Sequence, residues 1–148
     1  MSHVLLSVPP DPAFVRLTRL VAADLARKAG VPEDVLDDVR LAVGQACARA
    51  VSMHRHVGLA DPVVIGFADG PSVEVTVRDR APLAPAEGEQ ALAVLSAAAA
   101  SDPLWAASEG DEFTPSVVPE IALLQALAPD LSLTTGPDGS VVCMRWPR

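Results

Sequence analysis

Three polar side chains could carry chemistry. Gln45 and Arg49 lie four residues apart in DVRLAVGQACARAV, which begins at Asp38, and Asp79 follows the alternating stretch VEVTVR. Residues four apart share one side of an α-helix, so Gln45 and Arg49 share one flank. An amide is no useful base, and a guanidinium is a permanent cation without a lone pair for a metal. The pair is therefore unsuited to acid–base or metal catalysis.

The stretch that carries Gln45 and Arg49 is predicted to be a core helix. It opens at Pro32, and acidic residues in its first turns suit the positive end of the helix dipole. Its apolar positions recur at helical spacing and form a buried stripe: Leu36, Val39, Val43, Ala46, Cys47 and Ala50. Gln45 and Arg49 are expected on the flank of this stripe, neither fully buried nor opposite the core. His54 and His56 follow without a third ligand in view, which disfavours a metal site.

The other periodic stretches predict a two-layer fold. Strands are expected at His3–Val8, Val63–Ala68, Ser72–Arg78, Leu131–Thr135 and Ser140–Trp146. A first helix follows Asp11-Pro12 and a short third helix covers Pro119–Ala128; the core-facing stripe of the first is expected to be Phe14, Leu17, Val21 and Leu25. This order predicts one domain, residues 1–148, of the α/β (α+β) class, a two-layer sandwich of one mixed sheet with its helices on one face.

The composition excludes several classes of function. The chain has 148 residues, a net charge of −8 and a single lysine, so no basic stripe could neutralise a phosphate backbone and no nucleic-acid binding is expected. No stretch has the form of a signal peptide or reaches the ~18 apolar residues of a membrane span, so a cytoplasmic protein is expected. Cys47 and Cys143 are too few and too far apart for a zinc signature and are predicted to be core residues.

The element order and three stretches resemble the anti-sigma-factor serine kinases, the small single-domain branch of the Bergerat-fold (GHKL, histidine kinase-like) ATPases in bacterial regulatory switches. The stretches are DVRLAVGQACARAV after an amphipathic helix, VEVTVRDRAP after a hairpin, and IALLQALAPDLSL before a final hairpin. The resemblance covers nearly the whole chain and implies the Bergerat fold.

The resemblance also implies that the catalytic positions are degenerate. In the family, a Glu on the second helix polarises a water or a substrate hydroxyl, and an Asn one turn later holds the magnesium that bridges the phosphates. Gln45 and Arg49 stand at these positions, and neither can do the chemistry of the residue it replaces. Catalysis and a metal are therefore not expected, and Gln45→Glu with Arg49→Asn should leave folding nearly unchanged.

The nucleotide-binding positions implied by the resemblance are altered as well. In the first glycine box, Asp-x-Gly, the Asp accepts from the adenine amino group; Asp79 matches it, and Ala81 replaces the Gly. A residual adenine contact and a purely structural Asp79 both stay open. The second glycine box aligns with Val118 to Ile121, where Glu120 marks a degenerate phosphate loop without either glycine. ATP with magnesium is therefore not the expected cofactor.

Two functions from different classes follow from the resemblance. The leading hypothesis is a non-catalytic regulator that binds a sigma factor, an anti-anti-sigma factor or a homologous kinase. The alternative is an ATP-binding serine kinase with unusual site residues. Reuse of the pocket for another small ligand, with Arg49 as an anion anchor, also stays open. The segment at about 82–115 corresponds to the lid of ATP-binding relatives, and the family makes a homodimer plausible.

Overall fold

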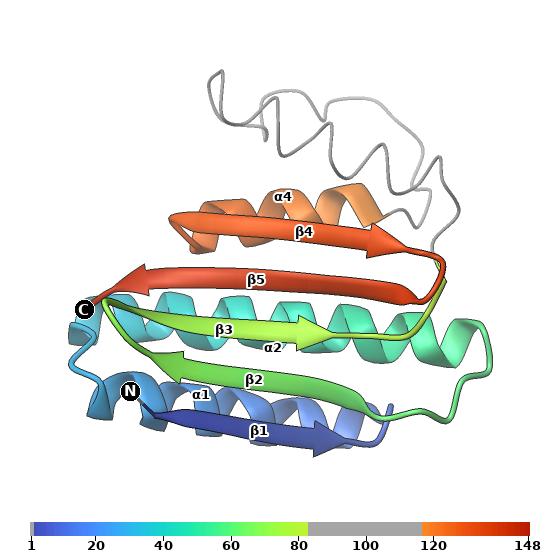
Figure 1. The fold of residues 1–148 in the computed structure, drawn as a ribbon, viewed down its shortest axis with the longest axis horizontal. Coiled ribbons are helices and arrows are strands. Elements are labelled where there is room, and N and C mark those ends of the chain that lie inside the picture. Colours follow the sequence, from blue (N-terminus) through green and yellow to red (C-terminus); the bar gives the residue numbers. More distant parts are fainter. Residues whose placement is uncertain (1, 83–116) are drawn as a thin grey trace.

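The computed structural model describes residues 2–82 and 117–148 as a two-layer α/β sandwich (Figure 1). Five strands form one sheet in the order β1-β2-β3-β5-β4. The strands are β1 (His3–Val8), β2 (Val63–Asp69), β3 (Ser72–Arg78), β4 (Asp130–Gly136) and β5 (Gly139–Pro147). The helices lie on one face of this sheet; they are the 3-10 turn η1 (Pro12–Phe14), α1 (Val15–Lys28), α2 (Glu33–His56) and α4 (Val117–Leu127). The predicted fold class is confirmed.

All four strand pairings are antiparallel, whereas the sequence predicts a mixed sheet. The reason is the pair of helices between the first two strands. α1 and α2 run in opposite directions and return the chain to the end of the sheet at which β1 finishes (Figure 1), so β2 runs against β1. The tight connections β2–β3 and β4–β5 then reverse the chain as antiparallel hairpins do.

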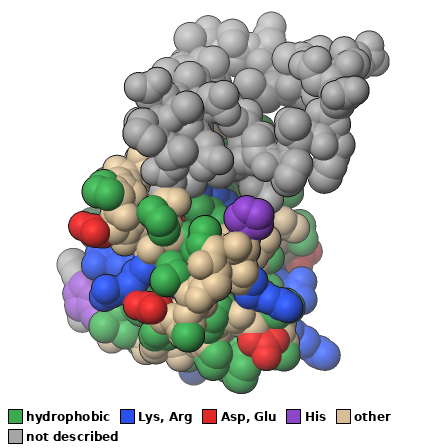
Figure 2. Space-filling model, turned by 90° about the vertical axis from the view of Figure 1, so that its right-hand side faces the viewer, with side chains coloured by type: hydrophobic (Ala, Val, Ile, Leu, Met, Phe, Trp, Pro, Cys, Tyr) green, Lys and Arg blue, Asp and Glu red, His purple; other side chains and the backbone are tan. Residues whose placement is uncertain are grey.

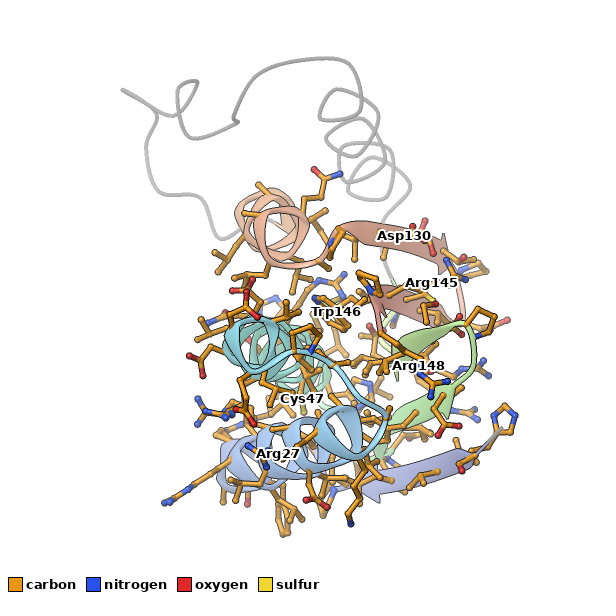
Figure 3. All side chains as sticks on the ribbon, turned by 90° about the vertical axis from the view of Figure 1, so that its left-hand side faces the viewer. Arg27, Cys47, Asp130, Arg145, Trp146 and Arg148 are labelled. Carbon is orange, nitrogen blue, oxygen red and sulfur yellow. The ribbon has the colours of Figure 1, made fainter. Side chains whose placement is uncertain are left out.

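The core lies between the helices and the sheet. α2 buries every residue of its predicted stripe, and β3 and β5 turn alternate side chains towards it: Val73, Val75, Val77, Val142, Met144 and Trp146. Trp146 lies between the two layers (Figure 3), and its indole Nε1 donates a hydrogen bond to the carbonyl oxygen of Leu127 at 3.1 Å. Arg145 lies on the opposite face of the sheet, where it pairs with Glu74 at 2.7 Å and with Asp130 at 3.3 Å.

Both cysteines are free and buried, as the sequence predicts. Cys47 packs in the core between α2 and α1 (Figure 3), and burial raises the pKa of its thiol. Burial raises the pKa of the Cys143 thiol as well, and neighbouring Glu74 adds to the shift. Both side chains therefore stay as neutral thiols at pH 7. None of the described helices is long and apolar enough to cross a membrane.

Helix α1 faces the core with only part of the predicted stripe, because Val21 and Leu25 pack partly buried against the core whereas Phe14 and Leu17 do not. Its buried residues are Thr18, Ala22, Ala23 and Ala26. Phe14 and Leu17, expected in the core, are 36% and 43% exposed. Small side chains let α1 approach α2 and the sheet closely, and this close packing decides which side of the helix is buried. Phe14 and Leu17 therefore lie at the surface.

This packing predicts a contrast between two substitutions in α1. Ala22→Leu should lower the free energy of unfolding by about 1–3 kcal/mol, because Ala22 is 1% exposed and leaves no room for three more carbons. Leu17→Ala should change it by less than about 0.5 kcal/mol, since that side chain is largely in solvent. Urea unfolding measures both values. If Leu17→Ala lowered the free energy of unfolding more than Ala22→Leu, the side of α1 that carries Leu17 would be the core face.

Candidate functional site

Arg49 and Asp79 form a buried ion pair at one end of the sandwich. Arg49 comes from α2 and Asp79 follows β3; Arg49 Nη1 lies 3.5 Å from Asp79 Oδ2, and the two side chains are 2% and 1% exposed. Gln45, one turn earlier on α2, is exposed. The prediction of one partly buried flank is therefore wrong for both residues. Four residues advance a helix by about 40° beyond one full turn, and this step carries Arg49 into the interior while Gln45 stays outside.

The carboxylate of Asp79 is held by donors from its own turn, from β5 and from α2. Oδ1 accepts hydrogen bonds from the backbone N–H groups of Ala81 at 3.1 Å and Ser140 at 3.2 Å, and Oδ2 accepts one from the Ser140 hydroxyl at 2.7 Å. With the Arg49 guanidinium, four donor groups meet a carboxylate that has about four lone-pair sites. Asp79 is therefore committed to contacts within the chain.

Gly139 allows the β4–β5 hairpin to reach Asp79. It has φ +119°, and a Cβ placed on it would overlap the carbonyl oxygen of Asp79 and lie 2.7 Å from Cα of Arg80. Only glycine fits such a close backbone approach. The next residue, Ser140, then meets Asp79 through its hydroxyl, its N–H and its carbonyl, which accepts from the Asp79 N–H at 3.0 Å.

Ser140 belongs to the site, although the sequence does not single it out. Its only signal is a hydroxyl directly after the Gly136–Gly139 turn, at the start of a mostly apolar strand. The register of β3 on β5, with Arg78 opposite Val141, brings Ser140 level with Asp79. That register arises from pairing between distant segments, which local sequence patterns do not specify.

His54 fixes the backbone next to Asp79. Its imidazole is fully buried, its Nδ1 lies 2.9 Å from the carbonyl oxygen of Asp61, and its Nε2 accepts the N–H of Arg80 at 2.9 Å. These partners assign the ring hydrogen to Nδ1. His54 therefore ties the C-terminal end of α2 to residues 79–81. His56 is exposed, and no three His, Cys, Asp or Glu side chains within residues 2–82 and 117–148 gather as a metal site.

The remaining predicted positions are only partly described. Ala81 is 1% exposed and donates its N–H to Asp79. Glu120 lies in the first turn of α4, close to where the sequence predicts the third helix to open. The predicted lid at about 82–115 lies, apart from Pro82, outside the described residues. The structure thus brings Arg49, Asp79 and Ala81 together and leaves Gln45 apart from them.

The end of the molecule at which α2 finishes carries basic and apolar side chains next to one another (Figure 2). A hollow of about 400 Å³ there is lined by Arg78, Arg80, Thr134, Thr135 and the Gly136–Val141 hairpin. It borders the backbone of Asp79, whose carboxylate is buried. The surface next to the ion pair is therefore an open hollow lined by both polar and apolar groups.

A family model of the histidine kinase-like ATPase domain matches residues 8–146. The chain belongs to this family. Among solved structures, it is similar to the RsbU and RsbW domains of Rv1364c from Mycobacterium tuberculosis, with a TM-score of 0.65 and 13% identity. That match covers 99% of this chain and 32% of the other, so this chain spans about a third of its neighbour's length. No curated protein matches the chain. The family model confirms the histidine kinase-like ATPase part of the resemblance stated from the sequence, and the structural match confirms the fold.

The ion pair predicts a large effect of Arg49→Ala on stability. Removing one partner of a buried pair leaves the Asp79 carboxylate without its counter-charge, so the free energy of unfolding should fall by about 3 kcal/mol. Gln45→Ala, at an exposed position of the same helix, should change it by less than about 0.5 kcal/mol. Urea unfolding compares the two variants. Equal effects of the two substitutions would contradict a structural role for the pair. The buried pair also corrects the expectation from the sequence, because Arg49→Asn should now destabilise the fold.

Gly139→Ala should lower the free energy of unfolding through a steric clash, and Gly30→Ala is the matched control that has a positive φ without the clash. Gly30 has φ +93° and open space where a Cβ would stand, so Gly30→Ala should cost only about 1–2 kcal/mol of backbone strain. Gly139→Ala should cost about 1–3 kcal/mol more, because its Cβ would overlap the backbone after β3. Thermal or urea unfolding of both variants gives the difference. Matching losses would show that the hairpin does not press against Asp79.

Proposed function

We propose that this chain is a non-catalytic member of the histidine kinase-like ATPase family that regulates by binding a protein. The partner would be a sigma factor, an anti-anti-sigma factor or a homologous kinase. The observation that carries the proposal is the buried network of Arg49, Asp79 and Ser140. It stands where the family resemblance places the magnesium ligand and the adenine acceptor, so structural contacts take up the groups that nucleotide chemistry needs.

The residues present do not fit magnesium and ATP. Magnesium takes hard oxygen ligands, whereas Arg49 offers only donors and carries a positive charge that repels the ion. The adenine amino group needs a free acceptor, and Asp79 already accepts from Ala81, Ser140 and Arg49. Gln45 is exposed and is an amide, so it does not supply a base. These arguments favour protein binding over the alternative, a working serine kinase.

The retained scaffold supports a binding role. The core of α2, β3 and β5 is filled by buried apolar side chains of the chain itself. Several large apolar side chains remain exposed on the helical layer, among them Leu17, Leu20 and Leu41. Fold and chemistry are separable, and a family scaffold without its catalytic groups still presents surfaces for partners.

Thermal unfolding with nucleotide tests the proposal. Millimolar Mg-ATP should leave the melting temperature of this protein unchanged, because a ligand stabilises only a folded state that binds it. A family member with intact Glu, Asn and glycine boxes is the positive control and should gain about 2.7 kcal/mol at a hundredfold excess over its Kd. A saturable upward shift in this protein would support the serine-kinase alternative.

Calorimetric titration tests the partner. Purified sigma factors, anti-anti-sigma factors and homologous kinases from the same genome are titrated into the protein, with and without Mg-ATP. One of them should bind at a stoichiometric ratio with the same Kd in both buffers. Failure of all three classes, or affinity that depends on ATP, would count against a non-catalytic regulator.

A further inference from the structure

A groove runs along the outer side of the two long helices, away from the Arg49–Asp79 network. Its lining is Arg16, Arg19 and Leu20 from α1 with Asp37, Arg40 and Leu41 from α2, and its volume is about 410 Å³. We call this the helix groove. A second hollow of about 270 Å³, between η1 and α2, includes Arg55. The outer face of the helical layer is therefore hollowed in two places.

The helix groove is basic on an acidic protein. It holds three arginines and one aspartate, a local net charge of +2, whereas the whole chain carries −8. Arg40 pairs with Asp37 at 3.1 Å. Arg16 and Arg19 form no hydrogen bond or ion pair with any residue in the described parts of the chain. Two guanidinium groups thus face solvent in a recess with their donors available.

Gly44 holds Arg19 in place. A Cβ on Gly44 would lie 2.5 Å from Cδ and 2.9 Å from Cγ of Arg19, so the arginine stem lies flat against the backbone of α2. Such a stem covers apolar surface while its charged group stays at the surface. The position of the Arg19 guanidinium is therefore set by the packing of α1 on α2.

The groove also offers apolar contacts. Leu20 and Leu41, one from each helix, are 55% and 49% exposed. Leucine beside arginine around a recess suits a partner that brings apolar and acidic side chains together. An amphipathic helix presents this combination along one face, with apolar residues at i, i+3 and i+4 and acidic residues beside them.

We propose that the helix groove is the docking site for an acidic amphipathic helix of a partner protein. This rests on the proposed regulatory function and names the chemistry of the partner. A second copy of this chain is a weaker occupant, since a symmetric contact through this face would set the arginines of one groove against those of the other. The recess is also too small and too apolar to follow a nucleic-acid backbone, which needs a long basic surface.

A synthetic helical peptide with leucines on one face and glutamates beside them tests the groove in the full-length protein. In NMR titrations, its binding should shift the amide signals of residues 16–20 and 37–41 and weaken with added salt. Arg16→Gln with Arg19→Gln should reduce affinity about tenfold, because interface charges steer and hold an opposite partner. Glutamine keeps the carbon atoms that rest on Gly44, so folding should be preserved.

Matched controls distinguish the effect of the groove arginines from the effect of the protein's overall charge. Arg78→Gln with Arg80→Gln removes the same charge from exposed positions beyond the groove and should leave peptide affinity unchanged. A peptide with lysine in place of glutamate should not bind. Equal loss in both double variants, equal binding of both peptides, or shifts confined to other residues would overturn the docking site.

The natural partner distinguishes this inference from the proposed function. If a titrated regulator binds and the acidic peptide competes with it, both stand. If the regulator binds wild type and Arg16→Gln with Arg19→Gln equally, the helix groove is wrong and the regulatory function remains. If the acidic peptide binds in the groove but no regulator binds, the docking chemistry stands and the proposed partners are wrong.

Discussion

One end of this sandwich depends on a charge pair buried where solvent cannot stabilise it. Removing Arg49 and Asp79 from water is costly, and the cost is offset only if every polar group of the pair finds partners. The Asp79 carboxylate finds them in two backbone N–H groups, one hydroxyl and the guanidinium. The requirement extends outward: Ser140 reaches Asp79 only because Gly139 permits close approach, and His54 holds the adjoining backbone. Three segments far apart in sequence are therefore fixed together.

The buried network around Asp79 and the outer side of α1 and α2 differ in the groups that they offer to a ligand. The Asp79 carboxylate accepts from four donor groups of the chain, and such a network rigidifies the fold but leaves few acceptor sites for a ligand. On the outer side of α1 and α2, Arg16 and Arg19 face solvent without a hydrogen bond or ion pair in the described chain, beside the exposed Leu20 and Leu41. A protein that lost its catalytic groups and kept its scaffold would be expected to act through the second part.

Several elements can be predicted from local patterns, because the periodicity of their apolar residues shows which face is buried. Alternation of apolar residues in β3 and β5 and the stripe of α2 place the core correctly, since one buried face imposes a period of two or 3.6. In α1 the same reasoning holds for Val21 and Leu25, which pack against the core, and fails for Phe14 and Leu17. Leucine is more apolar than alanine, but only small side chains allow the close contact between α1 and α2, so Ala22 and Ala26 are buried and Leu17 is not.

The sequence by itself determined the two-layer fold, the buried cysteines and the chemical limits of Gln45 and Arg49, because these depend on composition, periodicity and side-chain chemistry. Only the tertiary structure decided that Arg49 is buried and Gln45 exposed, that Ser140 joins Asp79, and that arginines from two helices meet in one groove. These facts depend on helix rotation, strand register and long-range packing. A local pattern carries no information about which distant residue will lie opposite.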